Sequence, residues 1–416
     1  MLKVCKFGGS SLADASRFLR VREIVAGDAA RRVVIVSAAG RRHAGDQKIT
    51  DLLYLCHAHL RYGVSCWDLW RHVCDRYLAI RDGCRLRFPL ERELEQIYGT
   101  FSAQTEQDWL ASRGEYLAAR LMAELLGFEF VDAAQWLQFD YSGQVRRADS
   151  YAKLASLADG RKIVTPGFYG TLPDGRIHTF SRGGSDITGA LAAAALRADV
   201  YENWTDVPGI LKADPGIVPN AAPIPQMSYE ELGQLSQVGT QVLHESAVAP
   251  VREMQIPLQI RSTLRPELPG TVIRARRFVG EPDVVGFAGR RRMAMLRVSG
   301  AAGSVPEVLS ALGMRPFCAS QAIGQYTALL PMADGQALHG TSEALRAQLR
   351  PEQMELRENL SVLAAVCRSS APIPDILRAV EGAGVPVHHV LRAAPALLMV
   401  VNDSQYETAL RAAAAV

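Results

Sequence analysis

The sequence predicts an α/β fold in which a mainly parallel sheet is covered by helices on both faces. Residues 33–37 read Val-Val-Ile-Val-Ser, a continuous run that is typical of a strand buried on both faces. Up to about residue 275, strand-like runs alternate with helical segments, as they do in proteins with parallel sheets. Two glycine pairs, at 8–9 and 183–184, each join a strand-like run to a helical segment.

Composition indicates an ordinary globular protein of two or three domains. The chain has 416 residues, of which 48% are hydrophobic and 21% charged. Its net charge of +3 gives no argument for a nucleic acid or an anionic membrane as partner. The seven cysteines contain no C-x-x-C pair and indicate reduced thiols of a cytoplasmic protein. We expect no signal peptide, and no apolar run reaches the roughly 18 residues of a membrane span.

The first glycine turn places a lysine beside a possible anion site. Residues 2–7 form a short strand that carries Lys6, and Gly-Gly-Ser at 8–10 leads into a helix expected over 15–26. Free backbone N–H groups at a helix start bind anions, and lysine acts as a point charge for phosphate. The spacing is neither that of a P-loop nor G-x-G-x-x-G. Alone, this turn is a weak signal.

The second glycine turn carries several candidate side chains. Residues 183–184 let the backbone approach a ligand closely, and an alanine-rich helix follows them. Ser185 and Asp186 lie where an N-cap and a first-turn acid belong, and Arg182 supplies a planar fork suited to a carboxylate or phosphate. Asp186 is a candidate to hold a metal or to orient the anion-binding groups. A tight turn with a good cap is the competing interpretation.

Two polar residues stand near the end of the strand at 33–37. Ser37 begins the loop at the carboxyl end of this strand, where open parallel sheets bind ligands. Thr50 and Asp51 are expected to cap a helix over 52–60. A turn residue and a helix cap are the simpler interpretations of Ser37 and Thr50.

Further candidates follow a strand and open a helix later in the chain. Thr205 and Asp206 come after a strand expected over 198–203, well placed for a ribose, a phosphate or magnesium. Ser-Arg-Gly-Glu at 112–115 is expected to open a helix that runs to about residue 127. In the first turn of that helix, Glu115 would simply complement the helix dipole.

The C-terminal region repeats the order strand, helix, strand and predicts two small α/β modules. We expect domain boundaries of 1–278 for the large domain, 279–350 for the first module and 351–416 for the second. The expected elements are 293–298, 305–312 and 325–330 in the first module, and 361–367, 373–384 and 396–401 in the second.

Four motifs resemble those of the aspartate kinases, which belong to the amino acid kinase superfamily. The motifs occur in the family's order across residues 1 to about 275, and the C-terminal modules resemble the paired ACT modules that follow the catalytic domain in this family. The motifs are Lys-Phe-Gly-Gly-Ser-Ser at 6–11, Ser-Arg-Gly-Glu at 112–115, Phe-Ser-Arg-Gly-Gly-Ser-Asp at 180–186 and Trp-Thr-Asp-Val-Pro-Gly at 204–209.

The resemblance implies phosphorylation of the side-chain carboxylate of L-aspartate by ATP, with Mg²⁺ carried by the nucleotide and no direct protein ligand to the metal. Lys6 and Asp186 would be catalytic. The residues implied for ATP and its phosphates are Lys6, Gly8, Gly9, Ser10, Gly183, Gly184, Thr205 and Asp206. Those implied for the amino acid are Ser37, Thr50, Glu115, Arg182 and Ser185, with Glu115 receiving the ammonium group and Arg182 the α-carboxylate.

The ACT-like modules imply a homodimer or higher homo-oligomer. Neither of the module loops at 299–304 and 368–372 matches an effector site well, so we expect weak or absent feedback inhibition.

Two departures from the family pattern leave other functions open. Gly216 stands where the family usually has arginine, and Gln241 where some members have lysine; Lys48 and Lys212 are the candidates to replace these cations. The alternatives are a pathway-dedicated kinase for another amino acid or carboxylate, and a non-catalytic regulatory paralogue. A dinucleotide-dependent oxidoreductase is excluded because G-x-G-x-x-G is missing.

Overall fold

The computed structural model separates into two compact units. The first comprises residues 1–210, 225–229 and 242–278, and the second 211–224, 230–241 and 279–416. Two segments that precede residue 279 therefore group with the C-terminal region. The structure describes residues 1–181, 183–239, 243, 245–276, 280, 282–322, 324–332, 339–393 and 396–416.

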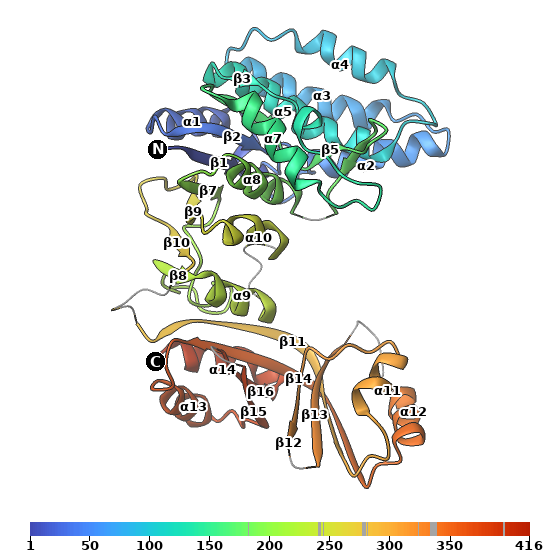
Figure 1. The fold of residues 1–416 in the computed structure, drawn as a ribbon, viewed down its shortest axis with the longest axis vertical. Coiled ribbons are helices and arrows are strands. Elements are labelled where there is room, and N and C mark those ends of the chain that lie inside the picture. Colours follow the sequence, from blue (N-terminus) through green and yellow to red (C-terminus); the bar gives the residue numbers. More distant parts are fainter. Residues whose placement is uncertain are drawn as a thin grey trace. The chain divides into compact units, whose positions relative to one another are not determined.

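The first unit is built on the parallel sheet that the sequence predicts (Figure 1). Every ladder in it is parallel except that between β9 and β10. In sheet order the strands are β3 (Glu129–Phe130), β4 (Ile163–Pro166), β2 (Arg31–Val36), β1 (Lys3–Phe7), β7 (Val200–Thr205), β9 (Leu258–Ser262), β10 (Thr271–Arg274) and β8 (Gln226–Ser228). A separate hairpin joins β5 (Tyr169–Thr171) to β6 (Ile177–Thr179).

Helices cover both faces of this sheet, as predicted. One face packs against α1 (Ala15–Ala26) and α5 (Gln107–Leu126), which α2 (Ile49–Arg61) and α3 (Trp67–Gly83) cover in turn. The other face packs against α8 (Gly184–Ala195), which contacts α7 (Arg147–Ala158) and α10 (Glu245–Glu253). The shorter helices are η1 (Gly9–Leu12), α4 (Leu90–Gly99) and α6 (Ala133–Trp136).

The predicted start of the helix that carries Glu115 is wrong. Helix α5 begins at Gln107, so that Asp108 and not Glu115 occupies its first turn. Leu110 and Ala111, which precede the Ser-Arg-Gly-Glu motif, are buried and continue the apolar face of the helix. Glu115 therefore lies in the middle of a helix, where it cannot serve the helix dipole.

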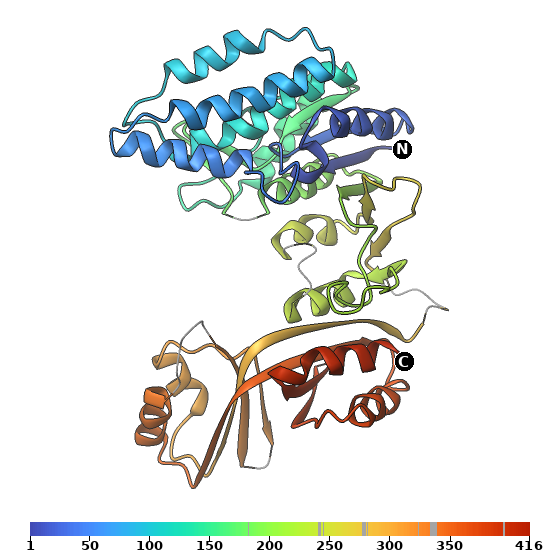
Figure 2. The same ribbon diagram turned by 180° about the vertical axis from the view of Figure 1, so that it is seen from behind.

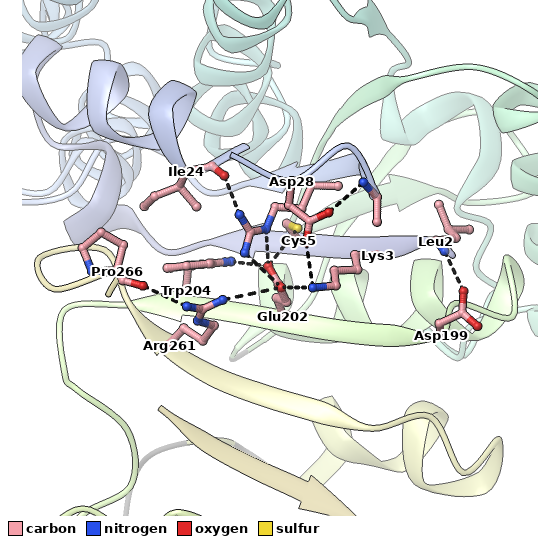
Figure 3. Close-up of polar contacts among 12 residues, drawn as sticks. Leu2, Lys3, Cys5, Ile24, Asp28, Asp199, Glu202, Trp204, Arg261 and Pro266 are labelled. Atoms are coloured by element: carbon pink, nitrogen blue, oxygen red, sulfur yellow. Dashed lines mark hydrogen bonds and ion pairs between the residues drawn. The ribbon is translucent and has the colours of Figure 1, made fainter. Parts of the chain in front are cut away.

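A buried ionic cluster joins the central strands on the face covered by α1 (Figure 3). Glu202 on β7 is fully buried, and Arg31 Nε donates to its Oε2 at 2.8 Å. Trp204 Nε1 donates to the same carboxylate at 2.9 Å, and Lys3 Nζ lies 3.3 Å from Oε1. Burial alone would raise the pKa of Glu202, but hydrogen bonds and charge from Arg31 bring it below its usual value. The carboxylate is therefore ionised. It links β7, which carries it, to β2 through Arg31 and to β1 through Lys3.

We expect Glu202→Gln to destabilise the first unit by about 3–5 kcal/mol, because the buried cations lose their counter-charge. Urea unfolding measures this loss. Glu129→Gln is the control, since Glu129 pairs with Arg161 at 2.9 Å on the surface, with both side chains about half exposed. Such exposed pairs contribute about 0–1 kcal/mol. Equal losses in the two variants would contradict a structural role for the Glu202 cluster.

The second unit holds an antiparallel sheet flanked by helices. In sheet order the strands are β12 (Cys318–Ala322), β13 (Gln325–Pro331), β11 (Val284–Ser299), β14 (Gln353–Cys367), β16 (Ala396–Asn402) and β15 (His389–Ala393). The helices are α9 (Tyr229–Val238), α11 (Val305–Ala311), α12 (His339–Leu349), α13 (Ile373–Gly382), α14 (Tyr406–Ala414) and η2 (Asp403–Gln405).

Two long strands, β11 and β14, run through both halves of this sheet (Figures 1 and 2). At one end β11 pairs with β13, and α11 and α12 cover an apolar cluster there. At the other end β14 pairs with β16, and α13 and α14 cover a second cluster. The two small α/β modules are thus present, and each uses a part of both long strands. Within the described residues, no helix is long and apolar enough to cross a membrane.

Candidate active site

The loops that follow β1, β2 and β7 meet at the carboxyl edge of the parallel sheet. The backbone N–H of Gly8 donates to Trp204 O at 3.1 Å, and that of Gly40 donates to Gly9 O at 2.8 Å. Gly40 packs so closely on the first glycine turn that an added Cβ would lie 2.5 Å from the carbonyl carbon of Gly9. Only glycine fits there, and the two loops form one continuous wall.

A cavity of about 530 Å³ opens against this wall. It brings together six of the residues predicted from the sequence: Gly9, Ser10, Ser37, Thr50, Glu115 and Asp206. The remaining lining residues come from the loop after β2 and the start of α2: Ala38, Ala39, Gly40, Arg41, His43, Ala44 and Lys48. Lys48, one of the candidate replacement cations, therefore lines the same cavity as these six predicted binding residues.

Glu115 reaches this cavity because α5 lies very close to the loop after β2. An added Cβ on Gly114 would lie 2.8 Å from Ala38 Cβ, and Tyr77 Oη donates to Gly114 O at 2.7 Å. Glu115 is only 5% exposed, and its Oε2 has no hydrogen-bond partner among the described residues. Burial raises its pKa to about 8. A buried carboxyl group at a cavity wall, with one oxygen unpartnered, is suited to a cationic ligand.

Lys6 and Asp186 form an ion pair between β1 and α8. Lys6 Nζ lies 2.5 Å from Asp186 Oδ1, and the two side chains are 9% and 22% exposed. The ammonium group also lies beside the first glycine turn, because an added Cβ on Gly8 would be 3.4 Å from Nζ. The structure thus joins the two predicted catalytic residues and places them next to Gly8.

The start of α8 differs from the expected capping arrangement. Gly183, with φ of 61°, occupies the N-cap, and Ser185 lies inside the helix. Ser185 fails as a cap because its side chain packs on Gly167, where an added Cβ would lie 2.6 Å from Ser185 Cβ. Gly184 similarly packs against the ring of Phe168. Arg182, predicted to bind the substrate carboxylate, lies outside the described residues, as does Gln241.

Two other predicted residues occupy helix and strand ends. Helix α2 begins at Ile49, so Thr50 lies in its first turn and Lys48, not Thr50, is the N-cap residue. The extended backbone of Lys48 sets this boundary, and the Thr50 side chain makes no cap. Thr205 ends β7, and its hydroxyl donates to Asp206 Oδ1 at 3.1 Å.

Sequence reasoning missed the groups that hold the cavity loop in place. Arg76 on α3 is buried, and it donates to Gly40 O at 2.7 Å and to Asp46 Oδ2 at 2.6 Å. Arg17 donates to Ser10 O at 2.7 Å on the other side of the wall. No local pattern marks these arginines, because their partners are backbone carbonyls and one aspartate on segments outside their own helices. Within the described residues, no group of three or more His, Cys, Asp or Glu could hold a metal ion.

A family model described as "Amino acid kinase family" matches residues 1–262. The chain therefore belongs to the amino acid kinase family.

The relatives narrow this assignment. Aspartokinase 3 of Bacillus subtilis is 35% identical over 303 residues, which is 69% of this chain and 66% of the relative. Lysine-sensitive aspartokinase 3 of Escherichia coli is 33% identical over 297 residues, covering 65% of this chain and 63% of the relative. The matched part thus spans slightly less than two thirds of these curated relatives.

Solved structures match over the whole chain. Aspartate kinase of Clostridium acetobutylicum has a TM-score of 0.90 and 33% identity, with 100% of this chain and 99% of that chain covered. Aspartokinase III of E. coli in complex with aspartate and ADP has a TM-score of 0.76 and 25% identity, with the same coverage. These similarities place the chain among the aspartate kinases of the family.

Proposed function

We propose that this protein transfers the γ-phosphoryl group of ATP to the side-chain carboxylate of L-aspartate. The products are 4-phospho-L-aspartate and ADP. The observation that carries this proposal is the cavity that Glu115, buried and with Oε2 unpartnered among the described residues, lines together with Gly9 and Ser10 of the first glycine turn. This cavity would thus combine a site for an ammonium group with a site for a phosphate. The similarity to an aspartokinase that binds aspartate and ADP supports the choice of substrates.

The chemistry requires no general base. A carboxylate is already a nucleophile, so one of its oxygens attacks the γ-phosphorus while the bond to the β,γ-bridging oxygen breaks, and ADP leaves with the electron pair. Catalysis then depends on positioning and on stabilising charge around the transferring group. In this assignment Lys6 and the turn at Gly8, Gly9 and Ser10 bind the phosphates, with Gly9 and Ser10 supplying the N–H groups, because the N–H of Gly8 already donates to Trp204 O. Gly183 and Gly184 let the nucleotide approach α8, and Thr205 and Asp206 contact it from β7.

Substrate binding follows from charge complementarity. Glu115 would receive the ammonium group of aspartate, with its carboxyl group ionised by the cation that enters. Arg182 would hold the α-carboxylate, and Ser37, Thr50 and Ser185 would supply hydroxyl groups around the acid. Lys48 lines the cavity and is our candidate to replace a missing nucleotide cation.

Mg²⁺ fits the donor set as a companion of the nucleotide. Asp186 and Asp206 are too few carboxylates to form a protein cage, so the ion would be carried by the phosphates of ATP with no direct protein ligand. Magnesium ions that bridge phosphates usually keep several waters. When bound, the ion would neutralise charge that develops on the phosphates, while Asp186 orients Lys6 towards them.

Trapping the product with hydroxylamine tests the proposed function. The purified full chain is incubated with ATP, Mg²⁺ and hydroxylamine across a panel of acidic amino acids, and aspartyl hydroxamate is the expected product. Product with another acid only would instead identify a pathway-dedicated kinase for that acid. A folded sample without turnover on any acid or nucleotide would indicate a non-catalytic paralogue, which the comparisons do not favour.

We further propose weak or absent feedback inhibition. The module loop at 299–304 borders a cavity of about 730 Å³, and Glu352 occupies the space beside Gly300, where an added Cβ would meet its side chain at 2.4 Å. A carboxylate at that place disfavours the carboxylate of an amino acid effector. We expect millimolar lysine or threonine to change kcat/KM by less than the roughly 5-fold at which typical allosteric coupling begins. A larger inhibition by either amino acid would contradict this proposal.

The remaining assignments concern organisation. We propose a catalytic domain that ends near residue 278 and two ACT-like modules that divide near residue 350. We also propose a homodimer or higher oligomer formed through these modules. The seven cysteines are all free thiols, which supports a reducing compartment such as the cytoplasm. Sedimentation velocity of the full chain tests the oligomeric state.

A further inference from the structure

Asn203 connects the two members of the Lys6–Asp186 pair. Asn203 and Lys6 are register partners on the neighbouring parallel strands β7 and β1, and their side chains lie on the α8 face of the sheet. Asn203 Nδ2 donates to Asp186 Oδ1 at 2.8 Å, the oxygen that Lys6 Nζ approaches at 2.5 Å. Asn203 is only 3% exposed, so water hardly competes for this contact.

The amide group fixes the orientation of the carboxylate. A carboxylate only accepts hydrogen bonds, so Asn203 must turn its NH₂ group and not its oxygen towards Asp186. Among the described residues, both side-chain contacts of Asp186 fall on Oδ1. With Oδ1 held by two donors, the rotation of the carboxylate is set and Oδ2 is the oxygen left to face a ligand.

Docking of α8 onto the sheet does not require this contact. Tyr201, two residues earlier on β7, already donates from Oη to the backbone carbonyl of Asp186 at 3.1 Å. Gly189 of α8 packs directly on the ring of Tyr201, where an added Cβ would lie 2.4 Å from Oη. The bond from Asn203 goes instead to the side chain of the acid that pairs with Lys6. Its effect is therefore on the pair itself.

We propose that Asn203 is a positioning residue, which holds Asp186 so that the ammonium group of Lys6 is aligned on the phosphates of the nucleotide. This inference rests on the proposed kinase function, because it assigns the pair a role in phosphoryl transfer. Asn203 acts through Asp186 and does not itself contact a substrate.

Three variants of the full chain separate positioning from packing. Asn203→Leu keeps the branched shape of the side chain and removes the donor, and we expect kcat to fall about 10-fold or more, as for loss of a hydrogen bond to a charged group. The KM for aspartate should stay within about 2-fold, because the contacts at Glu115 remain.

Asn203→Asp places a second carboxylate beside Asp186, and the acidic limb of its pH–kcat profile should move to higher pH, since two adjacent carboxylates resist ionising together. Tyr201→Phe is the control and should keep kcat within about 2-fold.

A second measurement does not depend on turnover. Isothermal titration with the non-hydrolysable analogue AMP-PNP and Mg²⁺ should show about 5-fold or more weaker binding to Asn203→Leu than to the wild type, because the Lys6–Asp186 pair is no longer aligned.

The outcomes distinguish this inference from the proposed function. Wild-type protein that forms no aspartyl hydroxamate overturns the proposed function, and the analogue titration then decides the role of Asn203 alone. Active wild type with unchanged kcat and unchanged analogue affinity in Asn203→Leu overturns only the positioning role. An unshifted pH profile in Asn203→Asp, with activity lost in proportion to the unfolded fraction, also overturns it.

Discussion

Lys6→Met is expected to lower kcat by about 1000-fold while the protein remains folded. The lysine ammonium is the charge that the structure places beside the first glycine turn, and loss of one preorganised charge-stabilising donor typically costs 10²–10³ in rate. Methionine has a similar length and fills the same space. Asp186 loses its ionic partner, but its side chain is 22% exposed and Asn203 still donates to it, so no isolated charge is buried. Steady-state kinetics with aspartate, together with circular dichroism, measure the two effects.

The control for this variant is Lys153→Met. Lys153 is exposed on α7 and does not line the cavity, so its replacement should leave kcat and the unfolding midpoint unchanged. If Lys6→Met kept most of the wild-type activity, the assignment of Lys6 to the phosphates would be wrong. If it unfolded, the ion pair with Asp186 would be structural instead.

The central sheet could be predicted because its strands carry local signals. The run at 33–37 is apolar at every position but the last, as a strand buried on both faces must be, and it became β2. The glycine pairs at 8–9 and 183–184 also mark real close approaches, to Trp204 and to Phe168. The apolar run and the glycine pairs are visible in consecutive residues, so one sequence is enough to find them.

Other features depend on contacts between distant residues and left no local pattern. Glu115 lies in the middle of a helix, because the five residues before its motif, 107–111, already belong to α5. Asn203 lies opposite Lys6 because of the register in which β1 and β7 pair. The sequence of either strand alone does not specify that register. The long strands β11 and β14 extend beyond the strands expected at 293–298 and 361–367 because they pair with each other along most of their length. In the two strand pairings, tertiary contacts decided what local propensity could not.

Glu115→Gln should weaken aspartate binding severely and stabilise the free protein at alkaline pH. The variant keeps the shape of the side chain but loses the charge that would pair with the substrate ammonium, so the KM for aspartate should rise about 100-fold or more, as for a buried charge pair that loses one partner. Glu95→Gln, an exposed glutamate of α4, is the control and should leave KM unchanged. A variant with wild-type KM would show that the ammonium group binds elsewhere.

The pH dependence follows from the pKa of about 8 that burial gives Glu115, against its ordinary value of 4.5. Between these values the folded protein keeps a proton that the unfolded chain releases, so this group's contribution to stability is present below about pH 4.5 and is lost as pH rises through 8. Glutamine does not titrate. The thermal midpoint of Glu115→Gln, relative to wild type, should therefore increase from pH 6 to pH 9.

Aspartate binding should depend on pH for the same reason. The Glu115 carboxyl group must lose its proton to pair with the ammonium group, so the affinity of the wild type for aspartate should rise from pH 6 to 8 and that of the variant should not. Parallel pH curves for the two proteins would mean that Glu115 is already ionised in the free cavity, held by a cation that the substrate would have to replace.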